Sequence, residues 1–172
     1  MRTAFSLLPL LPLALAAWRD LATRTIPNRV PAAIVLIGLP LRAATGGVAG
    51  LAWSCAFALL LFAALAAVHA RGILGGGDVK LAAAVGLGLP PVSMPQFLAA
   101  TAISGGVLAA AHLSLRLAPR RTRPPLHAPT LRRIYAIERW RVARRGSLPY
   151  GIAIASGGAY AILGPLLALR AG

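Results

Sequence analysis

The sequence predicts an all-α polytopic membrane protein with about six transmembrane helices and both termini outside the cytoplasm. Of its 172 residues, 58% are hydrophobic and 12% are charged, and the mean hydropathy is +0.76. Soluble domains carry about 25% charged residues. The 18 basic and 3 acidic residues also lie between long apolar runs instead of covering a soluble domain, as they would in a nucleic-acid-binding protein. This composition excludes a cytosolic enzyme, a disordered tail and a disulfide scaffold.

Six apolar segments account for the predicted helices. A helix needs about 20 residues to cross the hydrocarbon core. The long run 81–115 is interrupted by Pro90, Pro91 and Pro95, so it is expected to form two helices joined by a turn. The first two segments are short and need flanking arginines that reach the interface. The predicted spans are 3–18, 29–45, 48–69, 79–91, 94–115 and 147–168. A cleaved signal peptide is the alternative for the first.

The basic residues predict the orientation. The segments 19–29, 71–80 and 116–145 hold all basic residues except Arg2, Arg42 and Arg170. Cytoplasmic loops of membrane proteins are enriched in Lys and Arg, so these three segments are expected to face the cytoplasm. The whole chain, 1–172, is then a single transmembrane domain with a basic cytoplasmic loop at 116–146.

Within the basic loop, apolar residues alternate with arginines after Thr130, a plausible helix N-cap. This pattern predicts a short amphipathic helix on the anionic inner leaflet, and a docking surface for an acidic partner is the alternative. Glu138 lies among these arginines and is expected to form salt bridges.

The other two acidic residues are the strongest functional signal. Asp20 follows the first predicted span and Asp78 precedes the fourth, so the topology places both at the same depth on the cytoplasmic side. An ionisable residue close to hydrocarbon is costly and indicates function. Two helix-end charges with no further role are the alternative, because Asp78 would be favoured at a helix N-terminus.

Two neighbouring carboxyl groups cannot both ionise easily, so they can share a proton. The ionised group can deprotonate a water that attacks a peptide carbonyl, while the protonated group polarises that carbonyl. This is aspartyl protease chemistry, which needs no metal and no cofactor. Other chemistry is weakly supported. Cys55 is the only cysteine and is expected to be an apolar filler, and a dyad of Lys80 with Ser147 is not favoured. His69 lies near the Asp78 loop, where a solvated or interface-reaching side chain is favoured over one that touches the site.

Three stretches of the sequence resemble the type IV prepilin peptidases, the bacterial GxGD intramembrane aspartyl proteases. Asp20–Asn28 is similar to their D-x5-I-P-N motif, Gly75–Lys80 to their GGGD-V-K motif, and Leu148–Ala155 to the start of their last helix. The glycines of the second motif leave room for a substrate backbone and permit positive φ. In the first motif, Asn28 is expected to cap the next helix, with Pro31 in its first turn.

The resemblance implies that Asp20 and Asp78 are catalytic. It also implies that the motif residues around them contact substrate, namely Gly75, Gly76, Gly77, Lys80, Pro27 and Asn28. The expected activity is removal of the basic leader of a prepilin or pseudopilin at the cytoplasmic face of the bacterial inner membrane. With a single cysteine, the chain is similar to the minimal peptidases of tight-adherence (Flp) pilus systems, which lack the CxxC-containing domain. A small proton-coupled transporter using the same two aspartates is the alternative function, and the oligomeric state is left open.

Overall fold

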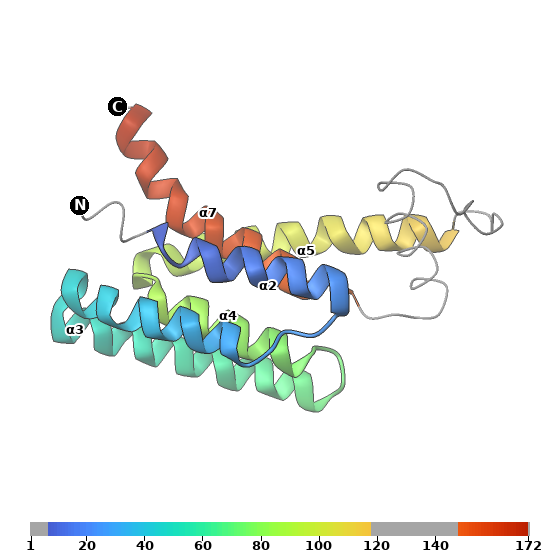
Figure 1. Ribbon diagram of the computed structural model, residues 1–172, viewed down its shortest axis with the longest axis horizontal. Coiled ribbons are helices and arrows are strands. Elements are labelled where there is room, and N and C mark those ends of the chain that lie inside the picture. Colours follow the sequence, from blue (N-terminus) through green and yellow to red (C-terminus); the bar gives the residue numbers. More distant parts are fainter. Residues whose placement is uncertain (1–6, 118–147, 172) are drawn as a thin grey trace. The chain divides into compact units, whose positions relative to one another are not determined.

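The computed structural model describes residues 7–117 and 148–171. These residues form helices and no strand, which confirms the all-α prediction (Figure 1). The helices are α2 (Leu10–Thr23), α3 (Arg29–Ala70), α4 (Gly76–Gly88), the short 3-10 helix η1 (Pro91–Ser93), α5 (Met94–Leu117) and α7 (Tyr150–Ala171). The predicted amphipathic helix of the basic loop, together with Glu138 and Ser147, lies outside the described residues.

Helix α3 contains the second and third predicted spans, which follow one another with a single break between them. At Gly47 the backbone adopts φ 60° and ψ −167°, which interrupts the helix. A Cβ at this position would meet nothing within 4 Å, so the positive φ and not the lack of space favours glycine here. Figure 1 shows α3 doubling back on itself as a hairpin of two helices.

A buried arginine fastens the two halves of this hairpin. Arg42 is only 8% exposed, and its Nε donates to Ser54 Oγ at 3.0 Å. Its two terminal nitrogens donate to Thr45 Oγ1 at 3.3 Å and to the carbonyl of Gly50 at 3.2 Å. A Cβ at Gly46 would lie 2.6 Å from the guanidinium, so the residues beside the turn must be small to admit it.

The chain divides into two compact units, the first formed by residues 1–105 and 149–172 and the second beginning at residue 106. Of the second unit, the final part of α5, residues 106–117, and Leu148 are described. Both predicted aspartates belong to the first unit. The expectation of one transmembrane domain over 1–172 stays a prediction.

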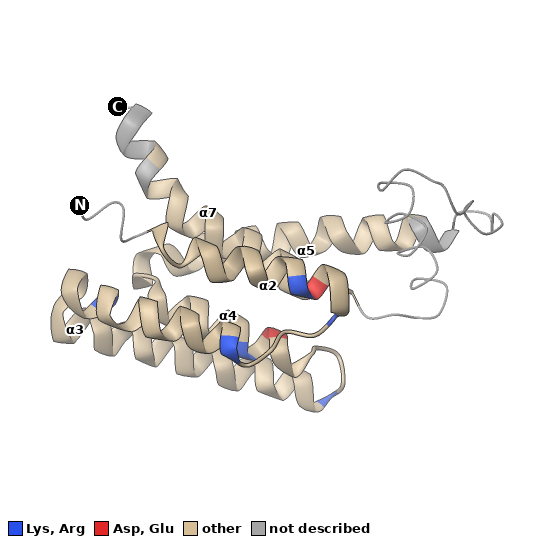
Figure 2. Cartoon of the chain, viewed as in Figure 1, with Lys and Arg blue, Asp and Glu red and all other residues tan. Residues whose placement is uncertain are grey.

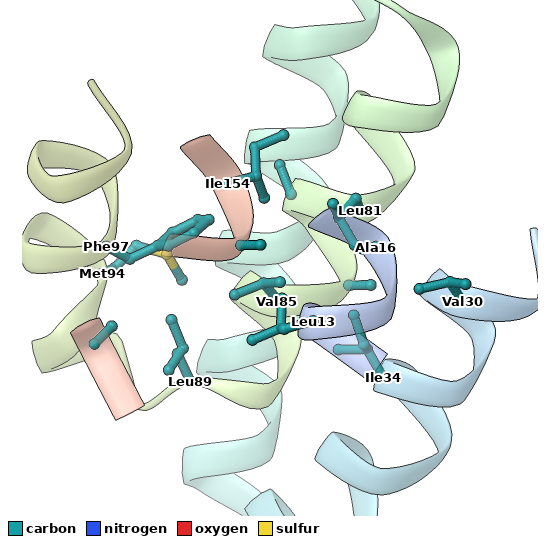
Figure 3. Packing of buried hydrophobic residues seen from close by; sticks show 14 residues of the cluster. Leu13, Ala16, Val30, Ile34, Leu81, Val85, Leu89, Met94, Phe97 and Ile154 are labelled. Carbon is teal, nitrogen blue, oxygen red and sulfur yellow. The ribbon is translucent and has the colours of Figure 1, made fainter. Parts of the chain in front are cut away.

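The core of the first unit forms around α4, which packs against α3 on one side and α7 on another, while α2 packs against α7 and α3. Figure 3 shows the buried side chains that meet there, among them Leu13, Ile34, Leu81 and Phe97, each at most 2% exposed. The helices approach closely where glycines face one another: a Cβ at Gly38 would lie 2.8 Å from the Cα of Gly88. Small residues at helix crossings are typical of packing in membranes.

The outer surfaces of the helices are strongly apolar. Leu11 and Trp18 of α2 and Leu36 and Leu59 of α3 are all at least 66% exposed. Within the described residues, Arg29–Ala70 and Pro91–Ser114 are long and apolar enough to cross a membrane, and only 11% and 17% of their most apolar windows are buried. Such exposed apolar surface needs a lipid environment. The chain is therefore a membrane protein, while the six-span topology with both termini outside stays a prediction.

Candidate active site

Asp20 lies in the last turn of α2, with its side chain only 5% exposed. The predicted span ended at residue 18, whereas the helix continues to Thr23, so a regular helical backbone positions the carboxyl group. The helix ends at Arg24, whose φ of 56° is left-handed and whose N–H donates to the carbonyl of Asp20 at 3.0 Å. This left-handed end turns the chain toward the I-P-N segment.

The first turn of α7 lies directly against Asp20. A Cβ built on Gly151 would lie 2.9 Å from Asp20 Oδ2, 3.0 Å from Asp20 Cβ and 2.8 Å from Ile26 Cδ1. No side chain fits there, so glycine at 151 allows α7 to approach the carboxyl group. The backbone N–H groups at the start of a helix also favour a nearby anion. The sequence singled out the run Leu148–Ala155 but not this glycine, whose role depends on a tertiary contact.

Asp78 lies in the first turn of α4. That helix begins at Gly76, three residues before the predicted start, so Asp78 is part of the helix and not of the preceding loop. Its carboxylate accepts a hydrogen bond from the backbone N–H of Gly75, the N-cap residue. This reach of an acidic side chain back to the N-cap N–H is one half of a capping box. A Cβ at Gly75 would lie 2.8 Å from Asp78 Oδ2 and would displace the carboxylate.

The two carboxyl groups interact electrostatically. The pKa of Asp78 is raised from 3.8 to about 6, mainly by burial and secondly by the negative charge of Asp20. The hydrogen bond from the Gly75 N–H acts in the opposite direction, because it stabilises the ionised form. The fold thus brings together the two aspartates, which are 58 positions apart in the sequence. Figure 2 shows the two acidic positions near the end of α2 and the start of α4.

The glycine run before Asp78 has none of the positive φ angles that glycine permits. The expectation of positive φ in this run is wrong, because among the described glycines only Gly47 and Gly72 have positive φ. Gly75 is extended, with φ −70° and ψ 140°, and the next two glycines begin α4. Space is what the run provides: a Cβ at Gly77 would lie 3.3 Å from Ile26 Cβ.

A second contact joins the two aspartate-containing motifs. The Nζ of Lys80 donates to Asn28 Oδ1 at 3.0 Å. The expected N-cap role of Asn28 is wrong in one respect, because the residue occupies the N-cap position of α3 but its side chain makes no capping hydrogen bond. Both Lys80 and Asn28 are exposed, as is Pro27, whose carbonyl accepts from the N–H of Val30 at 2.9 Å. The predicted substrate-contacting residues therefore gather beside the two aspartates.

His69 supports the loop that leads to Asp78. Its Nδ1 is 2.7 Å from the carbonyl oxygen of Leu74, within hydrogen-bond distance. The ring also packs beside Gly76, where a Cβ would lie 3.3 Å from His69 Nε2. The histidine thus touches the residues that precede Asp78.

The sequence matches a known protein family. The model of the type IV leader peptidase family matches residues 7–110, which is more than half of the chain and includes both Asp20 and Asp78. A search of curated proteins and a search of solved structures each found no match. Members of a peptidase family are expected to hydrolyse peptide bonds, in agreement with the chemistry that two interacting carboxyl groups allow. The chain belongs to the type IV leader peptidase family.

Proposed function

We propose that this protein is an aspartyl endopeptidase that removes the N-terminal leader of Flp-type prepilins or pseudopilins, with Asp20 and Asp78 as its catalytic pair. The electrostatic interaction between the two carboxyl groups is the observation that carries the proposal. Asp20 is almost fully buried, and burial together with the charge of Asp20 raises the pKa of Asp78 to about 6. Such a pair favours a state in which one group is ionised and the other protonated.

The reaction follows from this state. The ionised carboxylate takes a proton from a water molecule, whose oxygen then forms a bond to the carbonyl carbon of the scissile peptide. The protonated carboxyl donates a hydrogen bond to the carbonyl oxygen, where negative charge develops. When the C–N bond breaks, a proton passes to the departing amine nitrogen. The two products are a leader with a new carboxyl group and a pilin with a new amino terminus.

The neighbouring motif residues form the surface on which the substrate lies. Gly75, Gly76 and Gly77 have no side chains, so an extended peptide can approach the carboxyl group of Asp78 closely. The hydrogen-bonded pair of Lys80 and Asn28 is exposed beside them and offers polar groups to a peptide backbone.

The cleavage is proposed to occur at the cytoplasmic face, with six helices crossing the membrane. The basic segments 19–29 and 71–80 adjoin the two aspartates, and positive charge is retained in the cytoplasm. Single cysteines at Thr23, Ile73 and Thr45, which are all exposed, test this orientation in a Cys55→Ala background. In intact spheroplasts, an impermeant thiol reagent should label the cysteine at 45 and spare those at 23 and 73. Labelling of 23 and 73 from opposite sides would contradict a shared active site.

Co-expression with a substrate tests the activity itself. A host without its own prepilin peptidase would produce the protein together with an Flp-type prepilin, and the pilin would be analysed by gel mobility and N-terminal sequencing. The expected result is a shortened pilin that begins at one defined residue. An unprocessed pilin, with the peptidase present in the membrane, would overturn the proposal. A proton-coupled transporter is not favoured, because the aspartates lie at helix ends whereas transporters place such residues near the bilayer midplane.

A further inference from the structure

A cavity of about 270 Å³ lies among α2, α3, α4 and α7. Most of its wall is apolar, with Leu13, Ile34 and Ala161 among the lining residues. Its polar lining side chains lie near the α3 hairpin turn and the end of α4, and they are Arg42, Thr45 and Ser93. Leu89, which also lines the cavity, lies beyond the last residue of α4, and Asp78 lies in its first turn. At 1.5 Å per residue these two positions are about 16 Å apart, so the cavity is separate from the aspartates.

Arg42 brings a buried positive charge to this cavity. Its three hydrogen bonds within the described residues go to neutral oxygens, those of Ser54, Thr45 and Gly50. A guanidinium has five N–H donors, so two remain without a partner among the described residues. Within residues 7–117 and 148–171, no carboxylate forms a salt bridge with Arg42, and both aspartates lie at the other end of α4. A buried charge without a counter-ion is strongly unfavourable.

We propose that this cavity binds an anionic phospholipid, with Arg42 contacting the phosphate and an acyl chain filling the apolar part. A guanidinium binds a phosphate through parallel N–H bonds and would gain the counter-ion that the described residues do not supply. Basic pockets between transmembrane helices bind anionic headgroups on the cytoplasmic side of membranes, and Arg42 offers a similar pocket at the end of α4 that is predicted to lie outside. The apolar walls favour a lipid over a free anion, since inorganic phosphate would leave them uncovered.

Lipid binding can be measured on the full-length protein in a neutral detergent by native mass spectrometry. The three probes are phosphatidylglycerol, diacylglycerol with the same chains, and inorganic phosphate. We expect one phosphatidylglycerol per protein, with at least tenfold weaker binding of diacylglycerol and no binding of inorganic phosphate at the same concentration. Equal binding of diacylglycerol, which has no phosphate, would show that Arg42 does not contact the lipid headgroup and would overturn the proposal. Equal binding of inorganic phosphate would show a free-anion site instead of a lipid site.

Two variants keep the test independent of folding defects. Arg42→Gln removes the charge and should weaken phosphatidylglycerol binding at least tenfold. Leu41→Trp keeps Arg42 and its hydrogen bonds but fills the cavity from a half-buried lining position, and it should weaken binding to a similar degree. The control Arg71→Gln removes an exposed arginine near the other end of α4 and should leave binding unchanged. Unchanged affinity in both cavity variants would overturn the proposal. None of these readouts depends on peptidase activity.

Discussion

The two ends of α4 differ in what their polar groups can do. At its start, burial and the charge of Asp20 raise the pKa of Asp78 to about 6, so a proton can be gained or lost near neutral pH. At its end, Ser54 Oγ donates to the carbonyl of Leu89 at 3.0 Å and accepts from Arg42. Arginine keeps its proton throughout the physiological range. The first end is therefore suited to proton transfer, whereas the second is suited to holding structure and binding an anion.

Removing either carboxyl group is expected to have the largest effect. Asp20→Asn and Asp78→Asn each keep the size of the side chain but cannot exchange a proton, and each should lower leader cleavage by about 10³-fold or more. Pulse-labelled pilin processing measures this loss, with immunoblotting to show that each variant accumulates in the membrane. Glu138→Gln is the matched control, and it should process normally. Near-normal cleavage by either aspartate variant would exclude that residue from the mechanism.

Moving a carboxyl group without removing it should have the next largest effect. In Gly151→Ala, the new Cβ would meet Asp20 Oδ2 at 2.9 Å, so the carboxyl group or the start of α7 must shift. A displacement of this kind can lower a rate by about 10²-fold. Gly164→Ala is the control, since it lies on the same helix and its Cβ would meet nothing within 4 Å. If both alanine variants cleave at the wild-type rate, the close approach of α7 to Asp20 is unimportant for the reaction.

Substitutions of increasing size at Gly77 should lower the cleavage rate progressively, because they crowd the contact between the two motifs. The Cβ of Gly77→Ala would lie 3.3 Å from Ile26 Cβ, which a small shift of Ile26 can relieve. Gly77→Val adds two methyl groups at the same contact, so its overpacking should lower cleavage by about tenfold and exceed the effect of alanine. The comparison is made on initial rates at equal protein levels. An alanine variant as impaired as the valine variant would argue against a steric cause.

The raised pKa of Asp78 predicts a pH-dependent change in stability. Since the folded-state pKa is about 6 and the ordinary value is 3.8, the folded state holds the proton more tightly. The free energy of unfolding should therefore fall as pH rises from about 4 to 6. Asp78→Asn removes this term, so its Tm should exceed that of the wild type more at pH 8 than at pH 4. Thermal unfolding in detergent at both pH values measures the difference, and a gap that does not grow with pH would contradict it.

The smallest effect is expected from the Lys80–Asn28 hydrogen bond. Both residues are exposed, so their coupling should contribute only about 0.5 kcal/mol. A double-mutant cycle with Lys80→Ala and Asn28→Ala, followed by unfolding and by cleavage, separates two roles. A substrate contact should raise KM in both single variants. A purely structural link should change stability and leave KM unchanged.

The sequence was informative where one-dimensional patterns decide the outcome. The apolar runs correspond to helices, and the break between the second and third runs falls at Gly47. The approach of Asp20 to Asp78 followed from counting spans, because two residues at the same depth can meet. Helix boundaries were less accurate: α4 begins three residues early since Asp78 itself stabilises the first turn through the Gly75 N–H.

The site details that sequence reasoning missed all depend on tertiary contacts. Asn28 was expected to cap α3, but Lys80, which is 52 positions away, donates to its side chain instead. The glycines before Asp78 were expected to leave room for a substrate and to permit positive φ; they have no positive φ, and the space they leave lies beside Ile26 and Asp78. The sequence could not single out Gly151 within Leu148–Ala155 as the residue that contacts Asp20, because no local pattern distinguishes it from its neighbours. A single sequence contains no record of which distant side chain will occupy the space that a glycine leaves.

The contact between Gly151 and Asp20 also affects how the protein could be divided. The segment by which the family is recognised ends at residue 110, and it carries both aspartates. A fragment restricted to that segment would lack the wall that α7 places against Asp20, so the nearly complete burial of this carboxyl group would be lost. We therefore expect the smallest functional fragment to be longer than the segment that identifies the family. Complementation by a separately expressed α7 would be required for a truncated chain to recover the site.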